Sequence, residues 1–116
     1  MRRTIAFAAG LLLTWGSAGA AEIVSASAKN IGTARWQVDI AFTQGAAGRE
    51  DFVFLIELFP ENGGNKCMRL NTGQTNQTVK YSIVCRGVPF GARYFTATAK
   101  TVNPRYDSPP FRVDLK

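Results

Sequence analysis

Few residues in this chain of 116 amino acids could do chemistry, and the two cysteines are the most informative of them. The spacing of Cys67 and Cys85 is not the C-x-x-C of a redox-active dithiol, and the chain has no histidine to activate a thiol. An isolated pair in an exported chain predicts a structural disulfide. It would close a loop of about 18 residues and stabilise the fold by roughly 3 kcal/mol.

The remaining polar residues do not form a recognisable catalytic set. Without histidine there is no Ser–His or Cys–His nucleophile and the commonest metal ligand is missing. Glycoside hydrolysis needs two carboxylates across a cleft, but Glu50 and Asp51 would point to opposite faces of an extended segment, and Glu57 and Glu61 flank a hairpin. The "ENGGN" stretch carries one carboxylate, which is weak for calcium. We therefore expect a protein that is not an enzyme and has no metal or cofactor.

The first 20 residues predict a secretory signal peptide. Arg2 and Arg3 precede an apolar run from Thr4 to Trp15, and small residues follow it. Ala18-Gly19-Ala20 is an A-x-A cleavage site, and a cut after Ala21 is also compatible with the pattern. The apolar run is shorter than the roughly 20 residues that cross a bilayer, and no cysteine is available for lipidation. We expect a periplasmic or secreted domain over residues 21–116, with no membrane span in the mature chain.

The charge of the mature chain is mildly basic and evenly spread. The formal net charge is +6, and losing the two leader arginines reduces it to about +4. A nucleic-acid-binding protein would be expected to concentrate its cations in a patch or stripe, so we expect no nucleic-acid partner. Weak attraction to an anionic polymer at the cell surface is compatible with this charge.

Short segments of β-forming residues, separated by glycine, proline, asparagine and aspartate, predict the fold. They recur about every ten residues, which is typical of an all-β sandwich or barrel. The expected strands are Glu22–Ala28, Ala34–Thr43, Asp51–Phe59, Lys66–Leu70, Thr78–Cys85, Ala92–Val102 and Phe111–Lys116. Seven strands in about 95 residues match an antiparallel immunoglobulin-type sandwich.

Alternation of apolar and polar residues predicts which side chains form the core. In "ARWQVDIAFT" the apolar side chains occupy every second position, as in a strand with one buried face. The expected core consists of Trp36, Val38, Ile40, Phe54, Ile56, Ile83, Phe95, Phe111 and Val113.

The segment Asp51–Phe59 differs because it is apolar on both faces. A strand of this kind is covered on both sides, or it leaves a hydrophobic patch that binds a partner. We expect neighbouring loops and aromatic side chains to cover its outer face.

The end of the chain resembles a fibronectin type III domain. "VPFGARYFTATAKTVN" followed by "SPPFRVDL" has a Pro/Gly turn, a tyrosine early in a strand, a small residue late in the same strand and Ser-Pro before the last strand. The matching positions are Pro89, Gly91, Tyr94, Ala99, Ser108 and Pro109. Trp36 resembles the core tryptophan of that family. The resemblance implies a seven-stranded sandwich that acts by binding.

Two features depart from that family pattern. The apolar residues after Tyr94 are Phe95, Ala97 and Ala99, which have the opposite phase from the expected one. Either a bulge shifts the register, or Phe95 points inward and Tyr94 outward; we favour an inward Phe95. The expected disulfide is also unusual for the family, so the broader immunoglobulin-like class is the safer description.

Recognition of another molecule is the expected function. Loops at the ends of such sandwiches, and exposed sheet edges, are natural binding sites. The first hypothesis is a module that binds another exported or envelope protein through Arg105 and Tyr106, residue types common at interface hot spots. The alternative is a module for a glycan or anionic polysaccharide. A third hypothesis, a pilus-like subunit completed by strand exchange, is disfavoured because the chain contains its own final strand. The candidate residues for the polysaccharide site are Arg86, Phe90, Arg93, Tyr94, Arg105 and Tyr106.

Overall fold

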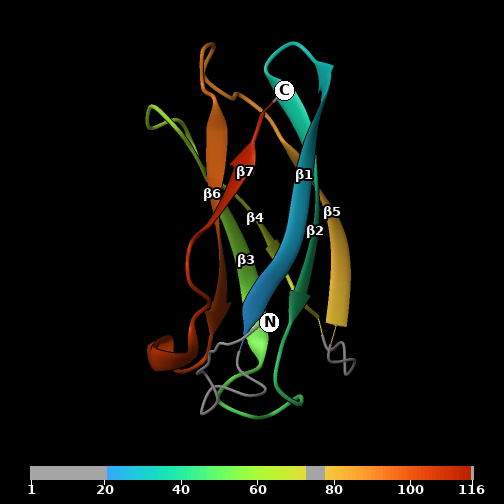
Figure 1. The fold of residues 1–116 in the computed structure, drawn as a ribbon, viewed down its shortest axis with the longest axis vertical. Helices are drawn as coiled ribbons and strands as arrows, with labels where there is room; N and C mark the ends of the chain where they lie inside the picture. Colours follow the sequence, from blue (N-terminus) through green and yellow to red (C-terminus); the bar gives the residue numbers. More distant parts are fainter. Residues whose placement is uncertain (1–20, 73–77, 116) are drawn as a thin grey trace, which may run out of the picture.

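The computed structural model describes residues 21–72 and 78–115; the predicted leader lies outside them. The described residues form two antiparallel β-sheets that face each other (Figure 1). Among them, no helix is long and apolar enough to cross a bilayer. The elements are β1 (Glu22–Gly32), β2 (Arg35–Thr43), β3 (Val53–Pro60), β4 (Cys67–Leu70), β5 (Thr78–Cys85), β6 (Tyr94–Thr101), the 3-10 turn η2 (Pro104–Tyr106) and β7 (Phe111–Asp114).

The strand order confirms the predicted all-β class. One sheet has the order β1-β2-β5 and the other has the order β4-β3-β6-β7. The last strand, β7, pairs with β6 of the same chain, so this edge of the four-stranded sheet is formed from the chain itself. Two antiparallel sheets with this number of strands are compatible with an immunoglobulin-like sandwich.

The core lies between the two sheets. Val38, Ile40 and Phe42 of β2 are buried and face Ile56 of β3 and Phe95 of β6. Each large apolar side chain that is fully buried stabilises the fold by about 1.5–3 kcal/mol relative to an exposed one. Of the predicted core residues, four others occupy the core as well, two of them half-buried at its margin; these are Trp36, Ile83, Phe111 and Val113.

The prediction that Phe54 belongs to the core is wrong. Its side chain is 41 % exposed, whereas Val53 is fully buried. The cause is a shift in register between β3 and β6, located between Val53 and Leu55. A bulge adds one residue to a strand and shifts the alternation of its side chains. Val53 therefore takes the inward position that strict alternation assigned to Phe54.

As expected, the side chain of Phe95 on β6 points into the core. Phe95 is fully buried and pairs with the buried Val113 of β7, while Tyr94 is half-buried. The Tyr94 ring instead stacks with the guanidinium of Arg112, 4.0 Å away. The inward row of β6 continues with two alanines, which leave room for the larger side chains of the facing sheet.

The disulfide between Cys67 and Cys85 is confirmed. Cys67 lies on β4 and Cys85 on β5, with their Cα atoms 5.5 Å apart. Because β4 and β5 are edge strands of different sheets, the bond joins the two sheets along one side of the sandwich.

Candidate functional site

The residues proposed for binding lie at opposite ends of the sandwich. Arg93 comes directly before β6 and Arg105 comes after it, so the eight residues of β6 separate them. At about 3.3 Å per residue this is roughly 26 Å. Figure 1 shows η2 at the end of the sandwich opposite the carboxyl terminus, whereas the backbone of Arg93 bonds to Leu115 near that terminus. The structure therefore does not bring the six candidate residues into one site.

The loop between β5 and β6 presents Phe90 at its tip. The backbone N–H of Ala92 donates to the carbonyl of Pro89, and Gly91 has a φ of 93°, which closes a tight turn. Phe90 is fully exposed, while Val88 of the same loop is buried. Arg93 is occupied by several hydrogen bonds to the Glu61 carboxylate, which lower the pKa of Glu61. Arg86 is exposed and follows β5.

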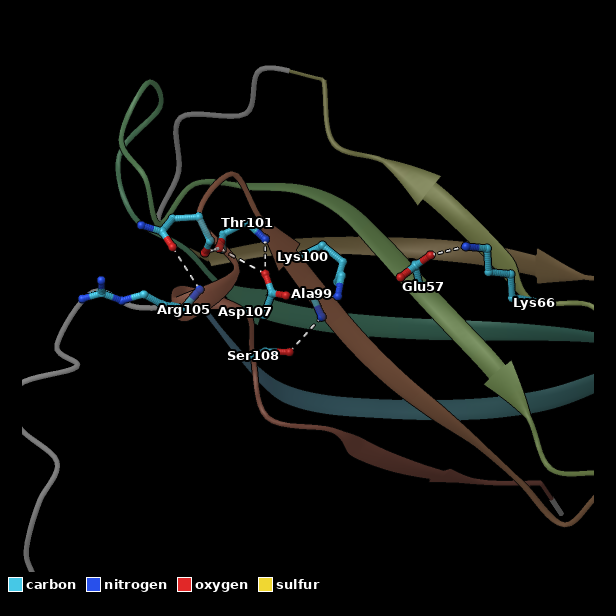
Figure 2. Close-up of polar contacts among 9 residues, drawn as sticks. Glu57, Lys66, Ala99, Lys100, Thr101, Arg105, Asp107 and Ser108 are labelled. Carbon is cyan, nitrogen blue, oxygen red and sulfur yellow. Dashed lines mark hydrogen bonds and ion pairs between the residues drawn. The ribbon is translucent and has the colours of Figure 1, made fainter. Parts of the chain in front are cut away.

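The loop between β6 and β7 is held firmly by its own side chains (Figure 2). Asn103 accepts a hydrogen bond from the backbone N–H of Arg105 and caps η2. Ser108 is buried and exchanges hydrogen bonds with the backbone of Ala99. The Arg105 side chain points away from the sandwich, and Tyr106 is half-buried.

Asp107 fastens the same loop electrostatically. Partial burial disfavours its charged form, but the backbone N–H of Thr101 and the Lys100 ammonium outweigh this effect and lower the pKa of the carboxyl. The carboxylate is therefore ionised at neutral pH, and the loop carries Arg105 on a well-fixed backbone.

Large exposed apolar side chains lie next to each other on the outer surface of the paired strands β3 and β4. Because Ile56 and Leu58 point into the core, the alternate residues of β3 point outward. Leu55 pairs with Leu70 of β4, and Glu57 pairs with Met68. Leu70 is 61 % exposed, Met68 48 % and Phe59 43 %. We call this surface the apolar face; it consists of Leu55, Phe59, Met68 and Leu70 around Glu57.

An ion pair fills the centre of the apolar face. Glu57 is nearly buried, and its carboxylate accepts a hydrogen bond from the Lys66 ammonium, as Figure 2 shows. The same ammonium lies 5.8 Å from the centre of the Phe59 ring. The Lys66 side chain therefore crosses the outer surface and neutralises the carboxylate, so the centre of this face carries no net charge.

The short strand β4 is fixed at both ends. Cys67 is anchored by the disulfide at one end. At the other, the Asn71 side chain is buried and donates to the Val53 carbonyl and to Gln44, while its own oxygen accepts from the Tyr81 hydroxyl. A satisfied buried network of this kind restricts local motion. Met68 and Leu70 are thus presented from a rigid backbone.

Two further ion pairs lie beside the apolar face. Lys100 contacts Asp107, and Arg112 contacts Asp114. These pairs lie on β6 and β7 or the loop between them, to one side of the apolar residues. Apolar side chains with a polar margin are typical of protein–protein interfaces, and here they also surround a neutralised ion pair.

The expectation that neighbouring loops and aromatic side chains would cover the outer surface of β3 holds only in part, because Glu57 is buried and Leu55 half-buried but Phe59 is exposed. The exposed Phe59 side chain agrees with the other possibility, in which part of this surface is an uncovered hydrophobic patch. Met68 and Leu70 were missed because the short segment that carries them has no clear alternation. The signal that could have found them is the two-sided apolar character of the preceding strand, since its outward residues need a neighbour.

Comparisons with known proteins do not place this chain in a family. No protein-family model matches it, and neither does any curated protein or solved structure. Within the described ranges, no three potential metal-ligating side chains lie together.

Proposed function

We propose that this chain is an exported, non-catalytic module that binds another envelope or cell-surface protein through the apolar face. The observation that carries the proposal is an exposed cluster of leucine, methionine and phenylalanine around the Glu57–Lys66 ion pair, with the Lys100–Asp107 ion pair beside it. Exposed apolar clusters with polar margins mark interaction surfaces, and methionine and aromatic residues are enriched in them.

The chemistry of this surface favours a protein partner with its own apolar patch. Because Glu57 is neutralised by Lys66, a partner needs no opposite charge at the centre of the contact. Removing water from the exposed leucine and methionine side chains would supply the driving force. The rigid β4 strand lowers the entropy cost of binding, because its backbone is already ordered.

Export and domain class form part of the same proposal. The disulfide fits an oxidising extracellular or periplasmic compartment. In the constant-type immunoglobulin arrangement the fourth strand belongs to the sheet of the first, second and fifth strands. Here β4 pairs with β3 instead. This difference supports the fibronectin type III-like description over the constant-type one.

The experiment begins by identifying the partner and then measures its affinity. A photoactivatable amino acid at Leu70 of the exported protein is used to crosslink it in the producing cells. The crosslinked protein is purified and titrated against the mature domain by calorimetry. We expect one-to-one binding, weakened at least tenfold by Met68→Ser plus Leu70→Ser, as expected for loss of interface hot spots.

A matched control removes exposed apolar groups elsewhere. Val84 is 43 % exposed on the other sheet and Val102 is 68 % exposed beyond β6. The double variant Val84→Ser plus Val102→Ser should bind like the wild type. Equal binding by both double variants would overturn the proposed surface. Dimerisation of the domain through this face, with no second protein, would overturn the proposed partner.

A further inference from the structure

The outer surface of the three-stranded sheet has a different chemistry from the apolar face. Because Val38 and Ile40 are buried, their neighbours on β2 point outward. The ladder places Ser27, Asp39 and Ser82 side by side across the three strands. The flanking rows are Lys29, Gln37 and Val84 on one side, and Ser25, Ala41 and Lys80 on the other. We call these three rows the three-strand face.

The short side chains of these rows leave a shallow open hollow. Its volume is about 520 Å³, and its lining includes Ser25, Ser27, Gln37, Asp39, Lys80 and Ser82. Each of these side chains ends in a hydroxyl, an amide, a carboxylate or an ammonium group. The hollow is therefore suited to a ligand rich in hydroxyl groups.

Asp39 lies in the middle row of this surface, and one of its carboxylate oxygens already accepts hydrogen bonds within the protein. Its Oδ1 atom accepts hydrogen bonds from the Ser82 hydroxyl at 2.5 Å and from the Gln37 amide at 3.2 Å. These bonds, with the Ser82 bond first, lower the pKa of Asp39. Among the described residues no hydrogen-bond donor is assigned to its Oδ2 atom, which is free to accept from a ligand.

Unpaired cations surround the hollow. Lys29 and Lys80 are exposed, and neither has a carboxylate within 4 Å among the described residues, although Lys29 is near enough to Asp39 to help lower the pKa of that carboxyl. Arg35 precedes Trp36 and Arg86 follows Cys85, so both arginines lie one level beyond the last ladder pair of β2 and β5. Neither of these arginines forms an ion pair in the described part of the chain, whereas Arg93 and Arg112 do.

Three of the cations, Lys80, Arg86 and Arg35, form a row along β5 and β2, and Lys29 lies on the other edge strand, β1. From the level of Lys80, opposite Ala41, to Arg35 there are six residues of β2, or about 20 Å. Arg35 and Arg86 lie opposite each other at the level beyond the last ladder pair, and like charges directly opposite each other destabilise a sheet. An anionic ligand that extends along this row would remove that repulsion.

We propose that the three-strand face binds an acidic polysaccharide lying along the strands, with its acidic groups on the cations and a sugar hydroxyl donating to Asp39. This inference does not depend on the apolar face, which lies on the other sheet. A nucleic acid suits the surface less well, because proteins bind single-stranded nucleic acids largely by stacking bases on aromatic side chains. The three rows contain no aromatic side chain on which bases could stack.

The test uses the mature domain and polygalacturonate as the acidic probe, with dextran as the neutral polysaccharide and a single-stranded oligonucleotide as the other polyanion. Binding is measured at low and at physiological salt. We expect polygalacturonate to bind, to weaken with added salt, and to bind more tightly than dextran or the oligonucleotide.

Three variants separate the proposed site from general charge attraction. Lys80→Gln and Arg105→Gln each remove one exposed cation that forms no ion pair with the residues the structure describes, but Arg105 lies in the loop between two strands of the other sheet. We expect Lys80→Gln to weaken binding by about tenfold and Arg105→Gln to have no effect. Asp39→Asn removes a negative charge and replaces a charged acceptor by a weaker one, so it should also weaken binding of polygalacturonate.

Each alternative result contradicts the proposal. Equal losses for Lys80→Gln and Arg105→Gln would mean that only net charge matters. Tighter binding by Asp39→Asn would mean that the carboxylate repels the ligand rather than accepting from it. Preference for the oligonucleotide would assign the face to another class of polyanion. Thermal unfolding of each variant confirms that the domain is folded when its binding is measured.

Discussion

Removing the disulfide should destabilise the domain strongly without changing its strand pairing. Cys67 and Cys85 join edge strands of the two sheets across 18 residues of sequence. The perturbation is the double variant Cys67→Ala plus Cys85→Ala, which leaves no free thiol that could form another disulfide. Both strands keep their ladder partners, β3 for β4 and β2 for β5.

The expected magnitude follows from the length of the closed loop. The chain-entropy relation gives about 3 kcal/mol for a loop of this size at 25 °C. If the free energy of unfolding falls by about 2 kcal/mol per molar urea, the urea concentration at the unfolding midpoint should fall by about 1.5 M. For a domain of this length the same loss should lower the melting temperature by about 12–24 °C.

Urea unfolding followed by circular dichroism provides the assay. The matched control is Val84→Ala, an exposed position directly before Cys85, which should change stability by less than about 0.5 kcal/mol. Chemical reduction of the wild type should reproduce the double variant. A loss below about 1 kcal/mol would refute the reasoning, because the unfolded chain would then not be restrained by the bond.

Three further predictions concern the core, the β6–β7 loop and the leader. Phe95→Ala should cost about 3–5 kcal/mol in urea unfolding, and Tyr94→Ala should cost clearly less; similar losses would contradict the assigned phase. Because the folded pKa of Asp107 is lowered, its stabilisation is complete above the unfolded pKa of about 3.9 and disappears as the pH falls through the folded value. Asp107→Asn should therefore cost about 1 kcal/mol at pH 7 and much less at pH 2, and a pH-independent difference would rule out the charge as the cause. Since Ala21 packs into the core, mass spectrometry of the exported protein should find it as the first residue, whereas a start at Glu22 would contradict this.

The strands could be predicted closely because alternation and turn residues encode them locally. The expected strand Thr78–Cys85 agrees with β5 at both ends. The bulge in β3 could not be predicted, because no glycine or other special residue marks the extra position between Val53 and Leu55. Strict alternation carried across it then placed Phe54 in the core.

The binding residues show a different limit of sequence reasoning. They were chosen as arginine and aromatic residues in loops, and residue type does not reveal where a loop lies. Successive loops of an antiparallel sandwich alternate between its two ends, so one intervening strand separates Arg93 from Arg105. That rule could have separated the candidates in advance. The apolar face and the three-strand face depend on which strands are neighbours, and that requires the register.

The most direct test of the central proposal is photocrosslinking from both sheets in the producing cells. The photoactivatable residue is placed at Met68 or Leu70 on the apolar face, and at Val84 on the other sheet as the matched exposed position. The account predicts that Met68 and Leu70 give an adduct with the same second protein, and that Val84 does not. An adduct of that protein from Val84 alone, with none from Met68 or Leu70, would contradict it.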